Sequence, residues 1–221
     1  MMIVNLIRKE FLLAQKAVVR TAVLCLLMIV VLIASDGSSS FQNNRFGFLI
    51  FLYFLLLVVV TWLSQAAVEE EKNPHAAALL CAAPYSRKNF VVAKYICYLI
   101  LFAGSVALYS IIAALHPGLN FLSAAELLLG FLVGAFLYGL YTNAAIRYGM
   151  AKAQYIVTAT ILIMVFVPMI LVRFFRPELI LFQLFLDGSG AAVPAILAGA
   201  SVCVFFVFLS ASIHCFEKKE L

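Results

Sequence analysis

Acidic and histidine side chains that could activate water or hold a metal ion occur at two places along this chain. Glu70 and Glu71 are adjacent, with His75 close behind them, and His116 is followed by Asn120 four residues later. Carboxylates and imidazoles are the groups that bind Zn²⁺ and act as general bases in hydrolases. A metal-assisted hydrolase is therefore the first chemistry to test against the rest of the sequence.

The positions of these groups along the chain argue against that chemistry. Intramembrane proteases of the CAAX type bring an EExxxR motif and an HxxxN motif to one water-filled site, but here His75 stands where the arginine would be. Glu70 is expected on the inner side of a membrane and His116 on the outer side, about 30 Å apart. A zinc site fails similarly, because His75, His116 and His214 are isolated from one another. We expect no catalytic residues and no bound metal.

Composition indicates an integral membrane protein. Hydrophobic residues make up 66% of the chain and charged residues 11%, whereas a soluble domain is about half apolar and a quarter charged. The five cysteines are odd in number and show no CxxC or metal-ligand spacing, so a disulfide framework is not expected. The net charge of +5 is assigned to cationic residues flanking membrane helices, and no nucleic-acid partner is expected.

Six apolar segments are long enough to cross a bilayer, which requires about 20 helical residues. Backbone polar groups in lipid must be hydrogen-bonded within the segment, so each is expected to be an α-helix. The sequence thus predicts an all-α integral membrane protein with one transmembrane permease domain over residues 1–221. The predicted spans are residues 17–34, 46–67, 91–115, 122–146, 153–172 and 193–213.

Lysine and arginine residues indicate the orientation, because they are enriched in cytoplasmic connections. The outer connections hold only Arg45, Arg173 and Arg176. Both termini are therefore expected in the cytoplasm of a multi-pass protein of the bacterial plasma membrane. The inner side holds the remaining cations: Arg8, Lys9, Lys16, Arg20, Lys72, Arg87, Lys88, Lys94, Arg147, Lys152, Lys218 and Lys219.

The segments outside the spans carry local signals of their own. Ser123 and Glu126 fit a capping box at the start of the fourth span, which explains Glu126 structurally. Residues 173–192 are apolar but too short to cross, so an outer hairpin or interfacial helix is expected before span six. The N-terminal residues predict an amphipathic interfacial helix or, alternatively, an extension of the first span. Its apolar positions recur at helical spacing: Ile3, Leu6, Ile7, Phe11 and Ala14.

The connection between spans two and three is unusually charged and has helix boundaries of its own. Asn73 and Pro74 are typical of an N-cap and a first helical position. Pro84 ends the short helix, and Ser86 can cap the next one. We expect a short cytoplasmic helix parallel to the membrane that docks a soluble partner. A solvated loop is the alternative.

The order of these features resembles the ABC-2 type permeases of ATP-binding-cassette (ABC) transporters. Glutamates follow the second span, then come a lysine, a short helix, "PYSRKNFVVAKY" and a third span; "LIRKEF" and "FEKKEL" are similar to the ends of such subunits. The resemblance covers the whole chain and extends to small permeases that export peptides, such as those for phenol-soluble modulins. It implies an exporter of amphipathic peptides or other hydrophobic compounds.

The resemblance also implies partners. A permease dimer, homomeric or heteromeric, would dock two cytoplasmic ATPase subunits, which would hold ATP and Mg²⁺. This chain itself contains no GxxxxGK[ST] phosphate-binding loop, so it is not expected to be an enzyme or to bind a cofactor. By resemblance, the coupling residues would be Glu69, Glu70, Glu71, Lys72, Asn73, His75, Tyr85, Ser86, Arg87 and Lys88.

Mildly polar residues within the spans are candidates for a translocation path. Thr61 and Gln65 lie in the inner half of span two, and Tyr138, Tyr141 and Asn143 in that of span four. Hydrogen bonding between helices is the alternative role for each of them.

Small residues in the fourth span indicate close helix packing. Gly130 and Gly134 form a GxxxG pattern, with Gly139 further on, and small residues let membrane helices approach closely. Packing within the subunit and packing between two subunits both remain open.

A secondary transporter or channel without an ATPase is the alternative function. Such proteins usually place ionisable groups at mid-membrane. The centres of the predicted spans carry none, since Arg20, Lys94, Glu126 and Arg147 lie near span ends and can reach the interface.

Overall fold

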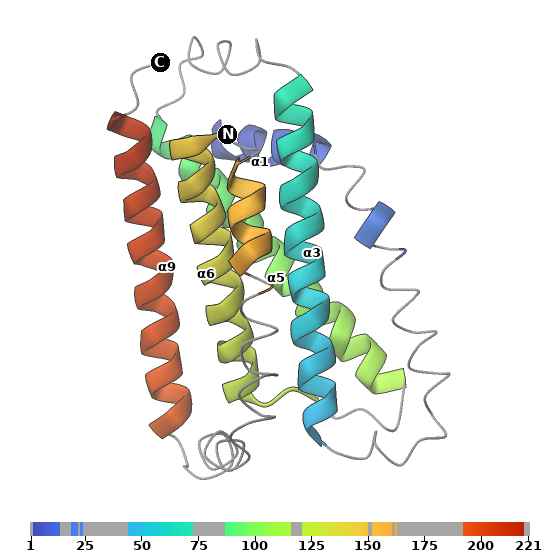
Figure 1. Cartoon of the computed structure of the whole chain (residues 1–221). Coiled ribbons are helices and arrows are strands. Elements are labelled where there is room, and N and C mark those ends of the chain that lie inside the picture. Colours follow the sequence, from blue (N-terminus) through green and yellow to red (C-terminus); the bar gives the residue numbers. More distant parts are fainter. Residues whose placement is uncertain are drawn as a thin grey trace. The chain divides into compact units, whose positions relative to one another are not determined.

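The structure of the protein is a computed structural model. It describes residues 2–13, 19–21, 23, 44–72, 87–115, 121–149, 152–160, 162 and 192–218. Within these residues all regular structure is helical and no strand occurs, which confirms the all-α prediction for this part of the chain. The labelled helices are α1 (Met2–Leu13), α3 (Asn44–Lys72), α5 (Arg87–Leu115), α6 (Ala124–Tyr148) and α9 (Ala192–Lys218) (Figure 1).

The chain forms two compact units. One comprises Met1–Ser123 with the last turns of α9, Ile213–Leu221, and the other comprises Ala124–Ser212. The first contains α1, α3 and α5, and the second contains α6, the helical residues 152–160 and most of α9.

In the first unit, α3 and α5 pack along one face of each helix. On α3 the buried side chains recur every three or four residues, and on α5 they fall on one face from Tyr98 through Ser105 and Tyr109 to Ile112, as expected for helices that share an apolar stripe. Phe51 lies edge-on to Tyr109, and Trp62 contacts Leu101. Because positions advance on α3 as they decrease on α5, the two helices run in opposite directions.

Helix α1 completes the first unit. Figure 1 shows α1 lying across α3 and α5 near the end where α3 finishes and α5 begins, and α1 contacts both helices. Leu6 is buried on its inner face, whereas Arg8 and Leu12 are exposed. The structure thus has a helix over Met2–Leu13, where the sequence predicts an N-terminal helix; whether it is interfacial or extends the first span stays a prediction.

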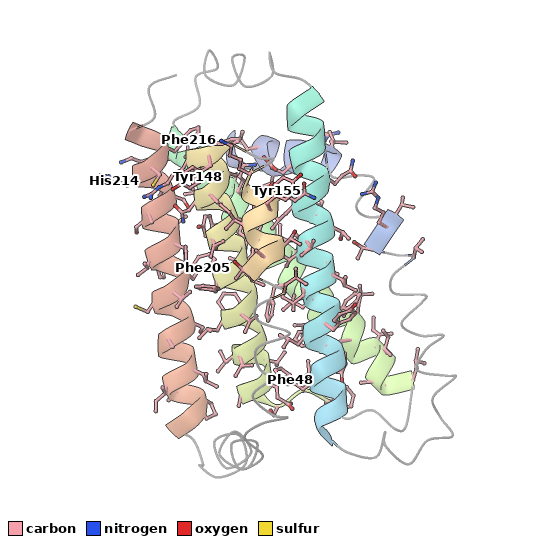
Figure 2. All side chains as sticks on the ribbon, viewed as in Figure 1. Phe48, Tyr148, Tyr155, Phe205, His214 and Phe216 are labelled. Atoms are coloured by element: carbon pink, nitrogen blue, oxygen red, sulfur yellow. The ribbon has the colours of Figure 1, made fainter. Side chains whose placement is uncertain are left out.

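In the second unit, α6 and α9 pack side by side. Phe205 projects from α9 toward α6 (Figure 2), and its ring lies 6.0 Å from that of Phe131. Leu197 packs with Ala125, and Phe208 packs edge-on to Phe136. Contacts advance along both helices together, so α6 and α9 run in the same direction, as the predicted alternation of spans four and six requires.

Three helices in the described part of the chain are long and apolar enough to cross a membrane: Lys88–Leu115, Ala124–Tyr148 and Pro194–Phe216. They correspond to predicted spans three, four and six. A shorter apolar helix, Phe51–Leu63, lies within α3 at predicted span two. Much of predicted spans one and five lies outside the described residues, and so do the coupling helix and the outer hairpin.

The observed helices extend beyond the predicted spans at the ends that the sequence assigns to the cytoplasm. Helix α3 continues to Lys72 and α5 begins at Arg87, because lysine, arginine and glutamate are good helix formers in water. The start of α6 at Ala124 agrees with Ser123 as the predicted N-cap and Glu126 as the third helical residue.

Gly149 ends α6 with a left-handed backbone conformation. Its φ is 91°, and its N–H donates to the carbonyl of Ala145 at 3.1 Å, which is the bond of a glycine C-cap. Its own carbonyl accepts from the N–H of Ala153 at 3.1 Å. One residue thus closes α6 and starts the hydrogen bonding of residues 152–160.

Candidate coupling and translocation residues

Six of the predicted coupling residues are described, and they lie on the two flanks of residues 73–86. Glu69, Glu70, Glu71 and Lys72 belong to the final turn of α3 rather than to a separate connection. At 29 residues, α3 is about 43 Å long, which exceeds the roughly 30 Å of bilayer hydrocarbon. The carboxylate-bearing turn is therefore a helical extension that can stand in water.

The other flank is the first turn of α5. Arg87 is its first residue, and Lys88 is exposed. Since α3 and α5 are antiparallel, Lys72 and Arg87 lie at the same end of the first unit. Asn73, His75, Tyr85 and Ser86 lie outside the described residues, so their predicted roles stay predictions.

Helix α1 lies against the α3–α5 pair at this end. The ring of Phe11 meets Trp62 edge-on, with ring centroids 5.0 Å apart and planes inclined by 72°. Trp62 is buried, and Leu101 of α5 packs against it as well. An aromatic edge-to-face pair of this kind contributes about 0.5–1.5 kcal/mol beyond its buried area.

A buried ion pair joins α1 to α5. The Lys94 Nζ lies 3.4 Å from Oε1 of Glu10, and the side chains are only 13% and 6% exposed. Glu10 was not among the residues singled out from the sequence, although its spacing from Leu6 places it on the apolar face of α1. A charge on an apolar face was the signal that could have found it.

Lys94 has a second neighbour on its own helix. Its Nζ lies 5.0 Å from the centroid of the Phe90 ring, within the range of a cation–π interaction. Phe90 in turn stacks on Phe216 of the last turns of α9, with centroids 5.7 Å apart and planes 24° apart. Aromatic and ionic contacts therefore connect the N-terminal helix, the start of α5 and the end of α9.

The candidate path residues of α3 are Thr61 and Gln65. The Thr61 hydroxyl donates to the backbone carbonyls of Leu57 at 2.8 Å and Val58 at 3.0 Å. Gln65 is 3% exposed. These hydroxyl bonds stay within one helix, so Thr61 needs no neighbouring helix to satisfy its donor.

The candidate path residues of α6 lie in the other unit. Tyr138 and Tyr141 are buried. The Asn143 Nδ2 donates to the carbonyl of Gly139 at 3.0 Å, while its Oδ1 is buried and accepts no hydrogen bond. The candidate path residues of α3 and those of α6 thus belong to separate units.

The glycines of α6 have a packing role in the second unit. Gly130 and Gly134 are buried in this unit. The tightest contact is at Gly139, where an added Cβ would lie 2.5 Å from Cγ of Phe208. Phe208 is on α9 of the same chain, so Gly139 serves packing within the subunit.

Among the described residues, no group of three or more His, Cys, Asp or Glu side chains could hold a metal ion. The described cysteines Cys97, Cys203 and Cys215 are free thiols.

Apolar helices of membrane-crossing length define a multi-pass helical membrane protein. A family model described as an ABC-2 family transporter protein matches residues 5–217, which is nearly the whole chain. The chain therefore belongs to the ABC-2 transporter family, and it is an ABC-2 type permease. Searches of curated proteins and of solved structures found no match.

Proposed function

We propose that this permease is the membrane subunit of an ABC exporter in a bacterial plasma membrane. It forms the translocation path with a second permease subunit, identical or different, and two separate cytoplasmic ATPase subunits bind ATP and Mg²⁺. The family match over residues 5–217 is the observation that carries the proposal. The apolar helices within α5, α6 and α9 supply membrane-crossing elements for such a path.

The ends of α3 and α5 support coupling at residues 69–88. Both helices are continuous up to the flanks of residues 73–86. A force applied by an ATPase between these flanks acts directly on two long helices, which move as rigid bodies. The carboxylates of Glu69, Glu70 and Glu71 and the cations of Arg87 and Lys88 supply charges of both signs for docking.

Amphipathic peptides or other hydrophobic compounds are the proposed cargo. Three polar side chains of α3 and α6 donate to backbone carbonyls of their own helix: Thr61 to Leu57 and Val58, Thr142 to Tyr138, and Asn143 to Gly139. Such helices offer an apolar surface with few strongly polar groups, which suits a cargo that is itself largely apolar.

Ion-coupled transport is the alternative, and the Glu10–Lys94 pair is the observation that bears on it. Buried ionisable groups in membrane proteins often mark ion or proton pathways. Lys94, however, lies seven residues after the start of α5, about 10 Å along a helix of about 43 Å. A pair so near the helix end is better suited to positioning α1 than to an ion site at the membrane centre.

Co-purification from the native membrane tests the proposal. A tagged full-length chain is expected to bring down a protein with a Walker A motif, and only that complex should hydrolyse ATP. ATP turnover by the chain purified alone would overturn the two-subunit arrangement. Protonophore-sensitive transport with no ATPase bound would favour the alternative. Mass spectrometry of material bound to the complex identifies the cargo class.

A further inference from the structure

Lys94 stands between two partners on different helices. Its ammonium lies 3.4 Å from the Glu10 carboxylate of α1 and 5.0 Å from the ring centroid of Phe90 on its own helix. Both members of the ion pair are largely shielded from solvent. The Glu10 carboxylate and the Phe90 ring can therefore each stabilise the Lys94 charge, which is largely shielded from water.

The Glu10 carboxylate of the ion pair is incompletely hydrogen-bonded. Its separation of 3.4 Å is longer than the roughly 2.7–2.9 Å of a strong charge-assisted hydrogen bond. Oε1 of Glu10 is buried and accepts no hydrogen bond. Buried ion pairs are often no more stable than apolar side chains of the same volume. A buried carboxylate with an oxygen that accepts no hydrogen bond is thus better suited to an element with two positions than to a permanent anchor.

The second partner, Phe90, can still stabilise the Lys94 charge when the Glu10 carboxylate is lost. A lysine ammonium sits on a flexible four-carbon stem and is attracted to an aromatic face. Phe90 is held in place by stacking on Phe216. If α1 moved away, the ammonium would keep the Phe90 ring and could extend along the start of α5.

We propose that Lys94 is a latch with two positions for the N-terminal helix. In the docked position Lys94 pairs with Glu10, and Phe11 packs on Trp62. In the released position the ammonium keeps only its contact with Phe90, and α1 leaves Trp62. The latch rests on the proposed function for its trigger, since α5 begins directly after residues 73–86 and ATPase movement there would shift Lys94 relative to α1.

Trp62 offers a direct measurement, because it is the only tryptophan in the chain. It is 3% exposed with Phe11 against it, so α1 docking is expected to shield it from a water-soluble quencher. Acrylamide quenching of Trp62 is measured on the full-length chain in lipid nanodiscs. Loss of one partner of a buried pair shifts the docked-to-released ratio by roughly 100-fold or more.

Glu10→Gln is therefore expected to red-shift Trp62 emission and to increase its quenching. Arg8→Gln is the matched control, because Arg8 is exposed on the same helix, and it should behave as the wild type. Wild-type quenching in Glu10→Gln would overturn the latch. A double variant, Glu10→Gln with Phe90→Leu, distinguishes release of α1 from unfolding of the protein. Phe90→Leu removes the ring that stabilises the released position, so Trp62 should regain part of its protection from the quencher. A further increase in quenching in this double variant would also overturn the latch.

Replacing the Glu10–Lys94 pair with apolar side chains tests whether transport requires the release of α1. Glu10→Leu with Lys94→Met is expected to keep Trp62 shielded but to abolish the ATP-dependent change in quenching and transport by the ATPase complex. Wild-type transport by this double variant would reduce the pair to a structural contact and overturn the latch. The Trp62 measurement on the isolated chain does not use the ATPase, so failure to find an ATPase would count against the proposed function alone.

Discussion

Phe208 of α9 fills the space that a β-carbon on Gly139 of α6 would need. An added Cβ would lie 2.5 Å from Cγ, 2.6 Å from Cβ and 2.8 Å from Cδ1 of that phenylalanine. The Cβ of Phe208 is fixed to its backbone, so a rotamer change cannot relieve the overlap. The two helices are thus held at a distance that only glycine permits.

Gly139→Ala is accordingly expected to destabilise the protein by about 1–3 kcal/mol, the usual cost of overpacking. The free energy of unfolding is measured by denaturant titration in mixed micelles. Gly199→Ala, on α9 with no atom within 4 Å of an added Cβ, is the control and should be neutral or slightly stabilising. Equal losses in both variants would contradict the contact, whereas Phe208→Ala should rescue Gly139→Ala.

Gly149 should be sensitive to substitution for a different reason. Its φ of 91° disfavours residues with a β-carbon, so Gly149→Ala is expected to cost about 1–2 kcal/mol. No side chain lies within 4 Å, so the cost arises from the backbone alone. Gly149→Asn should lose less, because asparagine tolerates the left-handed region. An alanine variant as stable as the asparagine variant would show that the conformation is not required.

Charge reversal tests the coupling segment. Glu70→Lys together with Arg87→Glu is expected to weaken ATPase docking, because the net charge of residues 69–72 changes from −2 to zero and that of Arg87 and Lys88 from +2 to zero, while the net charge of the chain stays the same. Insertion into the membrane should be unaffected. The amount of ATPase that co-purifies per permease is the measurement, and Arg147→Glu on α6 provides a control at a different connection. Normal ATPase recovery with the double variant would show that this segment does not dock it.

Cysteine labelling tests the translocation path. Thr61→Cys and Asn143→Cys, in a background with the five native cysteines replaced, are expected to react with a water-soluble maleimide if these positions line a hydrated path. Phe206→Cys is the control, because Phe206 is an exposed apolar residue on α9 and is expected to face lipid. Equal protection at all three positions would leave Thr61 and Asn143 with packing roles only.

Several features of the fold could be predicted from the sequence because they depend on neighbouring residues. Apolar segments of sufficient length indicated α5, α6 and α9, and Ser123 with Glu126 located the start of α6. Helix ends were less predictable: α3 runs five residues beyond the predicted end of span two, to Lys72. A hydropathy boundary marks where a helix leaves lipid, whereas the helix itself continues through polar residues of good helix propensity.

The choice of partner for each side chain was decided by the tertiary structure. The sequence indicated that glycines of α6 pack closely, but only the position of Phe208 singles out Gly139. Likewise, the sequence predicted that Lys94 would reach the interface, whereas the structure pairs it with Glu10, 84 residues earlier in the chain. Hydropathy and helix signals act over one or two helical turns, whereas a buried charge or a Cβ contact depends on which distant helix packs opposite.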